Sequence, residues 1–279
     1  MISIIPSEIP VPKLHQYLLG SVGPRPICFA STVDKEGRRN LAPFSFFNVF
    51  SANPPIAVFS PARSGRTGTH KHTYENIKEV PEVVINVVNY DMVHQTSLAR
   101  SPSEKGVDEF IKSGFTAIAS DLIKPFRVKE SPVQMECTVE QVIELGNEGG
   151  AGNLIICKIV KLHINELYLN EHGAIDQTKI DLVARMGGDW YCRAHGSALF
   201  EVTKPLTTCG IGIDALPDHI RLSDYLTGNE LGMLGNVEQV PDTESLQATK
   251  SKYASDNAIQ KAKELLRERK NIEALALLW

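Results

Sequence analysis

Two long β-rich runs joined by a glycine-rich segment constrain the fold of this chain more than any other feature. Residues 133–145 alternate between apolar and polar side chains, and residues 154–169 form a second long β-rich run. Four of the eight residues between the two runs are glycines. No helix pattern follows this segment, so a phosphate-cradling loop of the kind that opens a helix is not expected there. The pattern instead predicts a long antiparallel hairpin with a flexible tip.

The remaining β-rich runs are short and closely spaced along the chain. They cover residues 27–33, 38–41, 56–60, 83–88, 180–186 and 198–202. A single helical turn is expected near residues 13–19, in an extended arm before the first run, and short helices are expected between the runs at residues 70–78, 92–99 and 107–112. The strict alternation of strands and helices that builds a doubly wound parallel sheet is missing. The sequence therefore predicts a mostly β protein, a mostly antiparallel β-barrel or sandwich with inserted helices.

The composition changes at Lys204, which suggests a first domain over residues 1–204 and an extension over residues 205–279. Residues 255–279 carry apolar side chains at helical spacing, either as one helix or as two broken near residues 267–271. Ser255 is a suitable N-cap for this helix. We expect the helical C-terminal tail to pack against the barrel or against a second subunit.

Charge and cysteine usage exclude several classes of protein. A net charge of -4 over 279 residues argues against a nucleic-acid binder, which would carry a basic face. There is no apolar run of membrane-spanning length, and the N-terminus lacks the pattern of a signal peptide. The five cysteines are odd in number and form no C-x-x-C pair, which favours a reducing compartment. A cytoplasmic location without nucleic-acid or membrane partners is the expectation.

The segment covering residues 25–63 has an unusual mixture of aromatic and polar side chains. Between its apolar runs it carries four phenylalanines beside small amides and a hydroxyl, namely Phe44, Phe46, Phe47, Phe50, Asn40, Ser45 and Asn48. A hairpin loop does not need this mixture. A pocket for a flat aromatic ligand with a polar edge does, because such a ligand needs apolar faces and a few placed hydrogen-bonding groups.

Cations and hydroxyls follow in the next segment, residues 61–73. Arg63, Arg66, Thr69, Lys71 and Thr73 surround a loop that leads into a predicted short helix. Backbone N–H groups at the start of a helix, with Arg or Lys alongside, suit a phosphate group. Taken alone, this segment is better explained as a solvated basic loop. Next to the aromatic segment, it favours a phosphorylated aromatic ligand.

Other chemical signals in the sequence are weaker. Residues 210–215 match a loose G-x-G-x-x-A dinucleotide pattern, but Pro217 interrupts the helix that would receive the pyrophosphate, so a turn is favoured. His70 and His72 have no third ligand at motif spacing, so no metal site is expected. No G-x-S-x-G elbow is present, and no pair of carboxylates can be assigned to acid–base catalysis.

Several blocks of sequence resemble a known family. The blocks are Arg25-Pro26-Ile27, Ser31-Thr32-Val33-Asp34, the run from Asn40 to Asn48, and Asn53-Pro54-Pro55. Together they resemble the flavin reductase-like proteins of the FMN-binding split β-barrel type. Two later blocks, residues 71–77 and Val83-Val84-Ile85-Asn86, resemble the family patterns K-D-T-x-x-N-I and F-V-V-N, with His72 where the family usually has Asp. The resemblance covers about residues 14–205 and implies a Greek-key antiparallel split barrel.

The resemblance also implies which residues bind FMN. Ser31, Thr32 and Asn40 would meet the flavin or its ribityl chain. The isoalloxazine ring would be lined by Ala42, Pro43, Phe44, Ser45, Phe46 and Phe47. Ser60 and Arg63 would approach the phosphate end of the ribityl chain, and Lys71 and Thr73 would bind the phosphate.

The function implied by the resemblance is that of an FMN-dependent oxidoreductase, most simply an NAD(P)H:flavin reductase. NADH or NADPH would act as a transient hydride donor, and the flavin would carry the chemistry without a catalytic side chain. The implied assembly is a homodimer with FMN near the subunit interface. One alternative stays open, a flavoredoxin-like electron carrier that a partner protein reduces. The intact block from Asn40 to Asn48 argues against a barrel that has lost its flavin.

Overall fold

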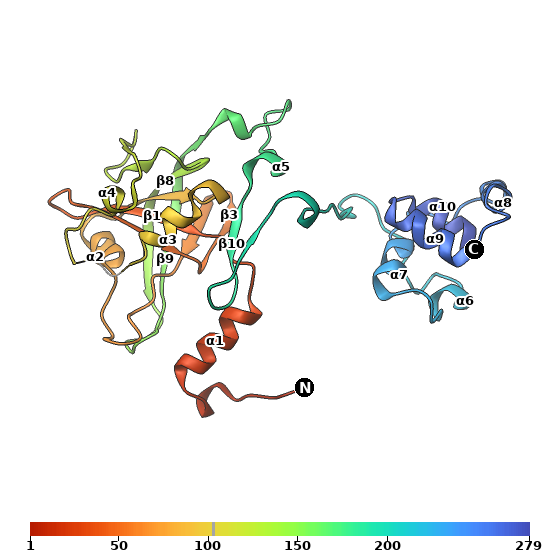
Figure 1. Cartoon of the computed structure of the whole chain (residues 1–279), viewed down its shortest axis with the longest axis horizontal. Coiled ribbons are helices and arrows are strands. Elements are labelled where there is room, and N and C mark those ends of the chain that lie inside the picture. The colour runs from red at the N-terminus through yellow and green to blue at the C-terminus, as the bar shows by residue number, and fades with distance from the viewer. Residues whose placement is uncertain (102–103) are drawn as a thin grey trace. The chain divides into compact units, whose positions relative to one another are not determined.

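The computed structural model describes residues 1–101 and 104–279 of the chain (Figure 1). Within these residues the chain divides into two compact units, Met1–Phe200 and Glu201–Trp279.

The first unit is built on one seven-stranded sheet in which every pair of neighbouring strands is antiparallel. In spatial order the strands are β2 (Arg39–Phe44), β1 (Cys28–Val33), β5 (Glu82–Val87), β8 (Val133–Glu144), β9 (Asn153–Ile164), β4 (Pro55–Phe59) and β3 (Phe47–Ala52). Two short two-stranded sheets accompany it, β6 (Ala117–Ile118) with β7 (Arg127–Val128), and β10 (Val183–Arg185) with β11 (Tyr191–Arg193).

The long hairpin predicted from the sequence is present as β8 and β9. The two strands pair from Val133 with Ile164 at one end to Glu144 with Asn153 at the other, with two register shifts in between. The glycines of the tip allow close packing against other segments. A Cβ atom on Gly152 would lie 2.8 Å from Oγ of Ser60, too close for a larger side chain without a rearrangement.

Three details of the sequence prediction differ from the structure. Strand β3 was not predicted, and it follows β2 after only two residues. The strand expected at residues 198–202 is wrong: the 3₁₀ turn Gly196–Ala198 ends at its first residue, residues 199–202 form no regular element, and β11 is the partner of β10. The single helical turn expected near residues 13–19 is an eleven-residue helix, α1 (Val11–Ser21), with Pro12 in its first turn, where proline is favoured.

Short helices connect the strands of the first unit. They are α2 (His72–Glu79), α3 (Val93–Leu98), α4 (Glu109–Ser113) and α5 (Gln177–Ile180), whereas α1 precedes the first strand. Four 3₁₀ turns complete the unit: η1 (Pro6–Glu8), η2 (Tyr90–Met92), η3 (Glu166–Tyr168) and η4 (Gly196–Ala198).

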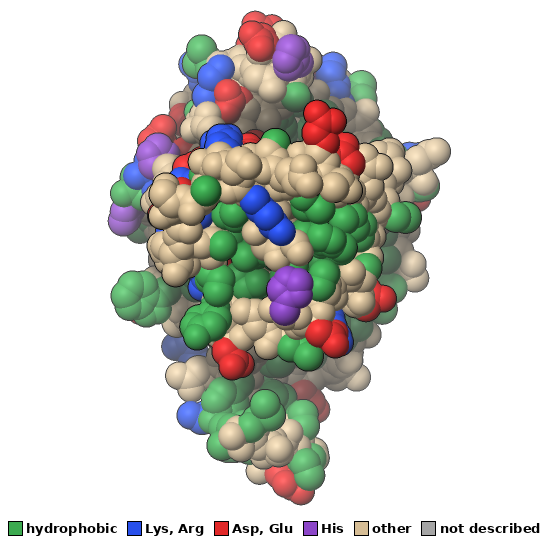
Figure 2. Space-filling model, turned by 90° about the vertical axis from the view of Figure 1, so that its right-hand side faces the viewer, with side chains coloured by type: hydrophobic (Ala, Val, Ile, Leu, Met, Phe, Trp, Pro, Cys, Tyr) green, Lys and Arg blue, Asp and Glu red, His purple; other side chains and the backbone are tan. Residues whose placement is uncertain are grey.

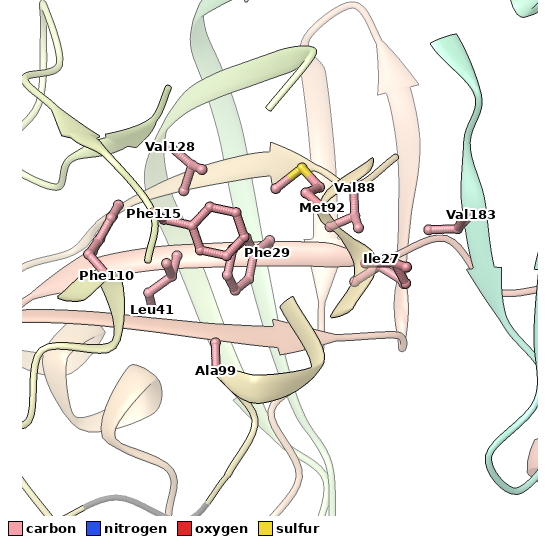
Figure 3. Close-up of a cluster of buried hydrophobic side chains, with 11 residues drawn as sticks. Ile27, Phe29, Leu41, Val88, Met92, Ala99, Phe110, Phe115, Val128 and Val183 are labelled. Atoms are coloured by element: carbon pink, nitrogen blue, oxygen red, sulfur yellow. The ribbon is translucent and has the colours of Figure 1, made fainter. Parts of the chain in front are cut away.

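The two faces of the sheet bury two separate hydrophobic cores. Strand β1 is buried along its whole length, and its side chains alternate between the cores because successive side chains in a strand point to opposite faces. Cys28 and Ala30 join the core that also contains Phe59, Ile85 and Ile155. Ile27 and Phe29 join the other core, where the rings of Phe29 and Phe115 meet edge to face with centroids 5.2 Å apart (Figure 3).

The second unit is helical and has a core of its own. Its helices are α6 (Asp218–Arg221), α7 (Gly228–Gly235), α8 (Thr243–Lys252), α9 (Ala258–Arg267) and α10 (Asn271–Leu278). The break predicted near residues 267–271 separates α9 from α10, but Asn257 rather than Ser255 caps α9. The glycines of the G-x-G-x-x-A pattern serve close packing, since a Cβ on Gly210 would lie 2.5 Å from the carbonyl oxygen of Gly235.

The surface mixes charged and apolar side chains. On the face shown in Figure 2, hydrophobic side chains gather around one basic side chain and one histidine. Among the described residues, no helix is both long and apolar enough to cross a membrane. The five cysteines are free thiols, and three of them, Cys28, Cys137 and Cys157, are buried in one core.

Candidate functional site

The predicted ring-binding segment lies where the seven-stranded sheet ends. Strands β2 and β3 are the two end strands of the sheet, and the turn Ser45-Phe46 joins them. An end strand leaves backbone N–H and C=O groups on its outer edge without a neighbouring strand. Pro43 within β2 fits such a position, because proline has no N–H to donate to a neighbour. Ala42 and Phe44 in β2 and Phe47 in β3 therefore lie on two open edges.

The four phenylalanines of this segment divide into an exposed pair and an inward pair. Phe46 and Phe50 keep 42% and 68% of their surface exposed. Phe44 and Phe47 pack against the core beside Phe59, with the Phe44 and Phe59 ring centroids 5.5 Å apart. Phe46 and Phe50 leave apolar surface available to a flat ligand, whereas Phe44 and Phe47 pack against the hydrophobic core.

Helix α1 reaches the same turn. The ring of His15 in α1 meets the ring of Phe46 edge to face, with centroids 6.3 Å apart. None of the residues of α1 is buried, and Val11, Tyr17 and Leu18 are exposed. The helix therefore lies beside the aromatic turn and keeps much of its apolar surface uncovered.

A buried layer of polar side chains connects the aromatic segment to α2. Asn40 in β2 donates from Nδ2 to Oγ1 of Thr73 at 2.9 Å and to Oγ1 of Thr32 at 3.3 Å. Asn76 in α2 donates to the same Thr32 hydroxyl at 3.2 Å. Thr32 and Thr73 have no exposed surface. In this structure the layer fixes β1, β2 and α2 to one another rather than presenting these hydroxyls to solvent.

Two predicted serines occupy different surroundings. Ser31 in β1 is fully buried, and its Oγ has no hydrogen-bond partner among the described residues. Ser60, directly after β4, accepts the N–H of Asn153 at 3.1 Å, and the Asn153 side chain donates to the carbonyl of Pro61 at 2.7 Å. Ser60 thus ties the start of the basic loop to the start of β9.

The loop over residues 61–69 closes on itself. The N–H of Gly68 donates to the carbonyl of Ser64 at 2.8 Å, and the N–H of Ser64 donates to the carbonyl of Thr69 at 2.8 Å. Arg63 is engaged within this structure: its guanidinium donates to Glu144 at 3.0 Å and to the carbonyl of Gly68 at 3.3 Å.

The N-terminal end of α2 has uncapped hydrogen-bond donors that suit an anion. Lys71 occupies the N-cap, and no side chain caps the first N–H groups of the helix. Within residues 1–101 and 104–279, the side chains of Lys71 and Arg66 form no ion pair or hydrogen bond. Uncapped N–H groups carry partial positive charge, and a free lysine beside them adds a full one. These donors fit a phosphate group.

Sequence reasoning did not single out three residues that shape this region. Glu144, at the end of β8, accepts hydrogen bonds from both Arg63 and Tyr74. Burial and the hydrogen bond to Glu144 raise the pKa of Tyr74 to about 12. Asn153 opens β9. Tyr74 lies inside the family-like block at residues 71–77, so the motif itself held a signal, whereas Glu144 and Asn153 are recognisable only once the hairpin is folded.

The histidine pair at residues 70 and 72 does not form a metal-binding group with a third ligand in the described part of the chain. The His70 ring instead stacks on Tyr74, with ring centroids 3.8 Å apart. Elsewhere in the described residues, Asp121, Glu136 and His163 bring together side-chain atoms of the kind that bind metal ions. The ammonium of Lys161 lies 2.6 Å from Asp121 and supplies a positive charge there.

Comparison with known proteins identifies the family. A family model described as flavin reductase like domain matches residues 20–178, more than half of the chain. The chain belongs to the flavin reductase-like family. An uncharacterized protein of Halalkalibacterium halodurans is similar, with 35% identity over 191 residues that cover 67% of this chain and 89% of the relative.

Solved structures agree with this membership. The nitrilotriacetate monooxygenase component B of Bacillus cereus is 32% identical and has a TM-score of 0.66, covering 73% of this chain and 98% of its own. A split barrel domain protein of Shewanella frigidimarina is 25% identical with a TM-score of 0.60, covering 71% and 95%. The split-barrel prediction for this flavin reductase-like chain is confirmed, as is its helical C-terminal region. The family supports flavin binding and a flavin-related oxidoreductase activity.

Proposed function

We propose that this flavin reductase-like protein is an FMN-dependent oxidoreductase, most simply an NAD(P)H:flavin reductase. The observation that carries the proposal is the start of α2, where uncapped N–H groups meet the unpaired ammonium of Lys71. A flavin that carries a phosphate matches this anion site better than riboflavin, which has none. The open sheet edges at β2 and β3 supply the apolar and hydrogen-bonding groups for a flat ring.

Each half of the proposed site has a distinct task. Phe46 and the backbone edges beside it would hold the ring, and Lys71 with Arg66 would neutralise the phosphate. Thr32, Asn40 and Thr73 would keep the two halves at a fixed separation, because their hydrogen bonds connect β1, β2 and α2.

The bound flavin would supply the redox chemistry, accepting hydride from NADH or NADPH and passing electrons to an acceptor. The protein would orient the ring and donate hydrogen bonds from the backbone. This division of tasks needs no acid–base side chain from the protein.

An anaerobic titration tests the proposal. Purified protein loaded with FMN is mixed with NADH or NADPH, and the visible flavin absorbance is followed. Rapid bleaching by either nicotinamide is the expected result. Bleaching by dithionite alone would replace the reductase with a flavoredoxin-like carrier that a partner protein reduces. Protein that takes up no FMN would contradict both.

We also propose a homodimer with FMN near the subunit interface. Support comes from apolar side chains that one copy leaves uncovered next to the aromatic turn, on α1 and on the end strand β3, where Val49 and Phe50 are exposed. Sedimentation velocity over a range of concentrations distinguishes the expected dimer from a monomer.

A further inference from the structure

The end of the long hairpin meets the basic loop through one carboxylate, Glu144. We infer that Glu144 is a positioning residue that gives the site its preference for FMN over flavins without a phosphate. It would do so by holding the loop at residues 61–69 in its closed shape. This inference rests on the proposed function, since it concerns the phosphate half of that same site.

The two carboxylate oxygens of Glu144 accept hydrogen bonds from two different segments. Oε2 accepts from the guanidinium of Arg63 at 3.0 Å, and Oε1 accepts from the hydroxyl of Tyr74 at 2.6 Å. Arg63 belongs to the loop, and Tyr74 belongs to the first turn of α2. One side chain of β8 therefore connects the loop to the helix whose start would receive the phosphate.

On this inference Arg63 would brace the loop, whereas the family resemblance implies that it approaches the phosphate end of the ribityl chain. Its guanidinium also donates to the carbonyl of Gly68 at 3.3 Å, and only 15% of its side chain is exposed. A guanidinium that braces the loop from inside has fewer donors left for a ligand. Arg66 and Lys71, which are exposed, remain as the cations that can reach a phosphate.

Backbone contacts hold the loop to the hairpin tip in the same place. The N–H of Arg63 donates to the carbonyl of Ala151 at 2.8 Å, and the N–H of Gly150 donates back to the carbonyl of Arg63 at 3.2 Å. A Cβ on Gly149 would lie 3.1 Å from the carbonyl oxygen of Ser64. The hairpin tip therefore packs closely on the loop, and these contacts hold the end of β8, which carries Glu144, in place.

Tyr74 adds a second constraint. Its ring is parallel to that of His70 within 4°, with centroids 3.8 Å apart. His70 lies between the loop and Lys71 at the N-cap of α2. The hydrogen bond to Glu144 therefore fixes a stacked pair that orients the segment carrying Lys71.

The test compares FMN with riboflavin, which has the same ring and no phosphate. Dissociation constants for both are measured by flavin fluorescence with the full-length protein stripped of flavin. Glu144→Gln keeps the size of the side chain but removes the charge that holds Arg63. It is expected to weaken FMN binding by about tenfold, the scale of one charge-assisted hydrogen bond, with riboflavin binding changed by less than about twofold.

Two further variants test whether the effect comes from the contacts of Glu144 and not from its charge alone. Glu140→Gln on the same strand removes an exposed carboxylate of equal charge and is expected to leave both constants unchanged. Tyr74→Phe keeps the stack with His70 and the Arg63–Glu144 pair, so it should weaken FMN by about threefold, in the same direction. It also carries the test if Glu144→Gln does not fold.

Three outcomes would overturn the inference. FMN binding could be unchanged by Glu144→Gln, it could become tighter because a released Arg63 reaches the phosphate, or both flavins could weaken equally. Each leaves the proposed function intact, because the wild-type protein still binds FMN. A wild-type protein that binds no FMN would instead remove the proposed function and this inference together.

Discussion

Glu136 offers the sharpest test of how the first unit is held together. Its carboxylate is fully buried in β8 and accepts the backbone N–H groups of Asp121 and Leu122, both at 2.8 Å. Nε2 of His163 in β9 lies 2.7 Å from the same carboxylate. Burial alone would raise the pKa of Glu136, but the N–H of Asp121, His163 and the N–H of Leu122 together lower it.

We predict that Glu136→Gln destabilises the first unit by about 3 kcal/mol. Glutamine has one acceptor oxygen where glutamate has two, so at least one charge-assisted bond of about 1.5–3 kcal/mol is lost. Breaking a buried pair by changing one partner costs about 3–5 kcal/mol, which sets the upper range. For a unit of this size, a loss of 3 kcal/mol lowers the Tm by about 6–12 °C.

The assay is urea denaturation of the full-length protein, followed through the β-sheet signal in circular dichroism, with calorimetry as a second measurement. Glu140→Gln, at an exposed position of the same strand, is the matched control and should shift stability by less than about 0.5 kcal/mol. A loss below about 1 kcal/mol for Glu136→Gln would refute the claim that its bonds hold the segment at Asp121 to the sheet.

The pH dependence gives an independent check on the same residue. Because the pKa of Glu136 is lower in the folded state, its contribution is fully present above the unfolded value of about 4.3. The contribution is lost as the pH falls through the folded value. The difference in stability between wild type and Glu136→Gln should therefore shrink below about pH 4. A difference that grows with acidification would contradict the sign of this shift.

Asn40→Ala leaves the hydroxyls of Thr32 and Thr73 with fewer partners, so urea denaturation should show a loss of about 2 kcal/mol; no loss would mean that the polar layer is not structural. Lys71→Ala should weaken FMN about tenfold and flatten the salt dependence of binding while sparing riboflavin, and equal losses for both flavins would contradict a phosphate contact. A fragment ending at Phe200 should fold with the stability of the first unit in the full chain, because the second unit has its own core; an unfolded fragment would contradict this.

Much of the fold could be read from the sequence because its strands obey local rules. The hairpin of β8 and β9 follows from alternation on both sides of a glycine-rich tip. Strand β3 was missed because Asn48, Val49 and Phe50 are all exposed, so no buried face produced an alternating pattern. The pairing of β10 with β11 was missed because three-residue strands are too short to show a period.

The segments that form the candidate site could be predicted from the sequence, but the contacts of their side chains could not. Arg63 and Lys71 carry the same charge in the sequence, yet one is held by Glu144 and the other is free of partners in the described part of the chain. The difference depends on Glu144, which lies 81 residues after Arg63 in the sequence. No local pattern encodes such a contact. Whether the predicted residues contact FMN stays a prediction.

The buried polar layer explains why two sequence blocks some thirty residues apart form one motif. Asn40 lies in the block that would hold the ring, and Thr73 lies in the block that would hold the phosphate; their side chains are joined by a 2.9 Å hydrogen bond. Buried polar groups need hydrogen-bond partners, so replacing Asn40 or Thr73 alone lowers the stability of the protein unless its partner is replaced as well. The ribityl chain limits how far the phosphate of FMN can lie from its ring. A layer that holds the two halves at one separation would therefore keep both of them within reach of a single FMN molecule.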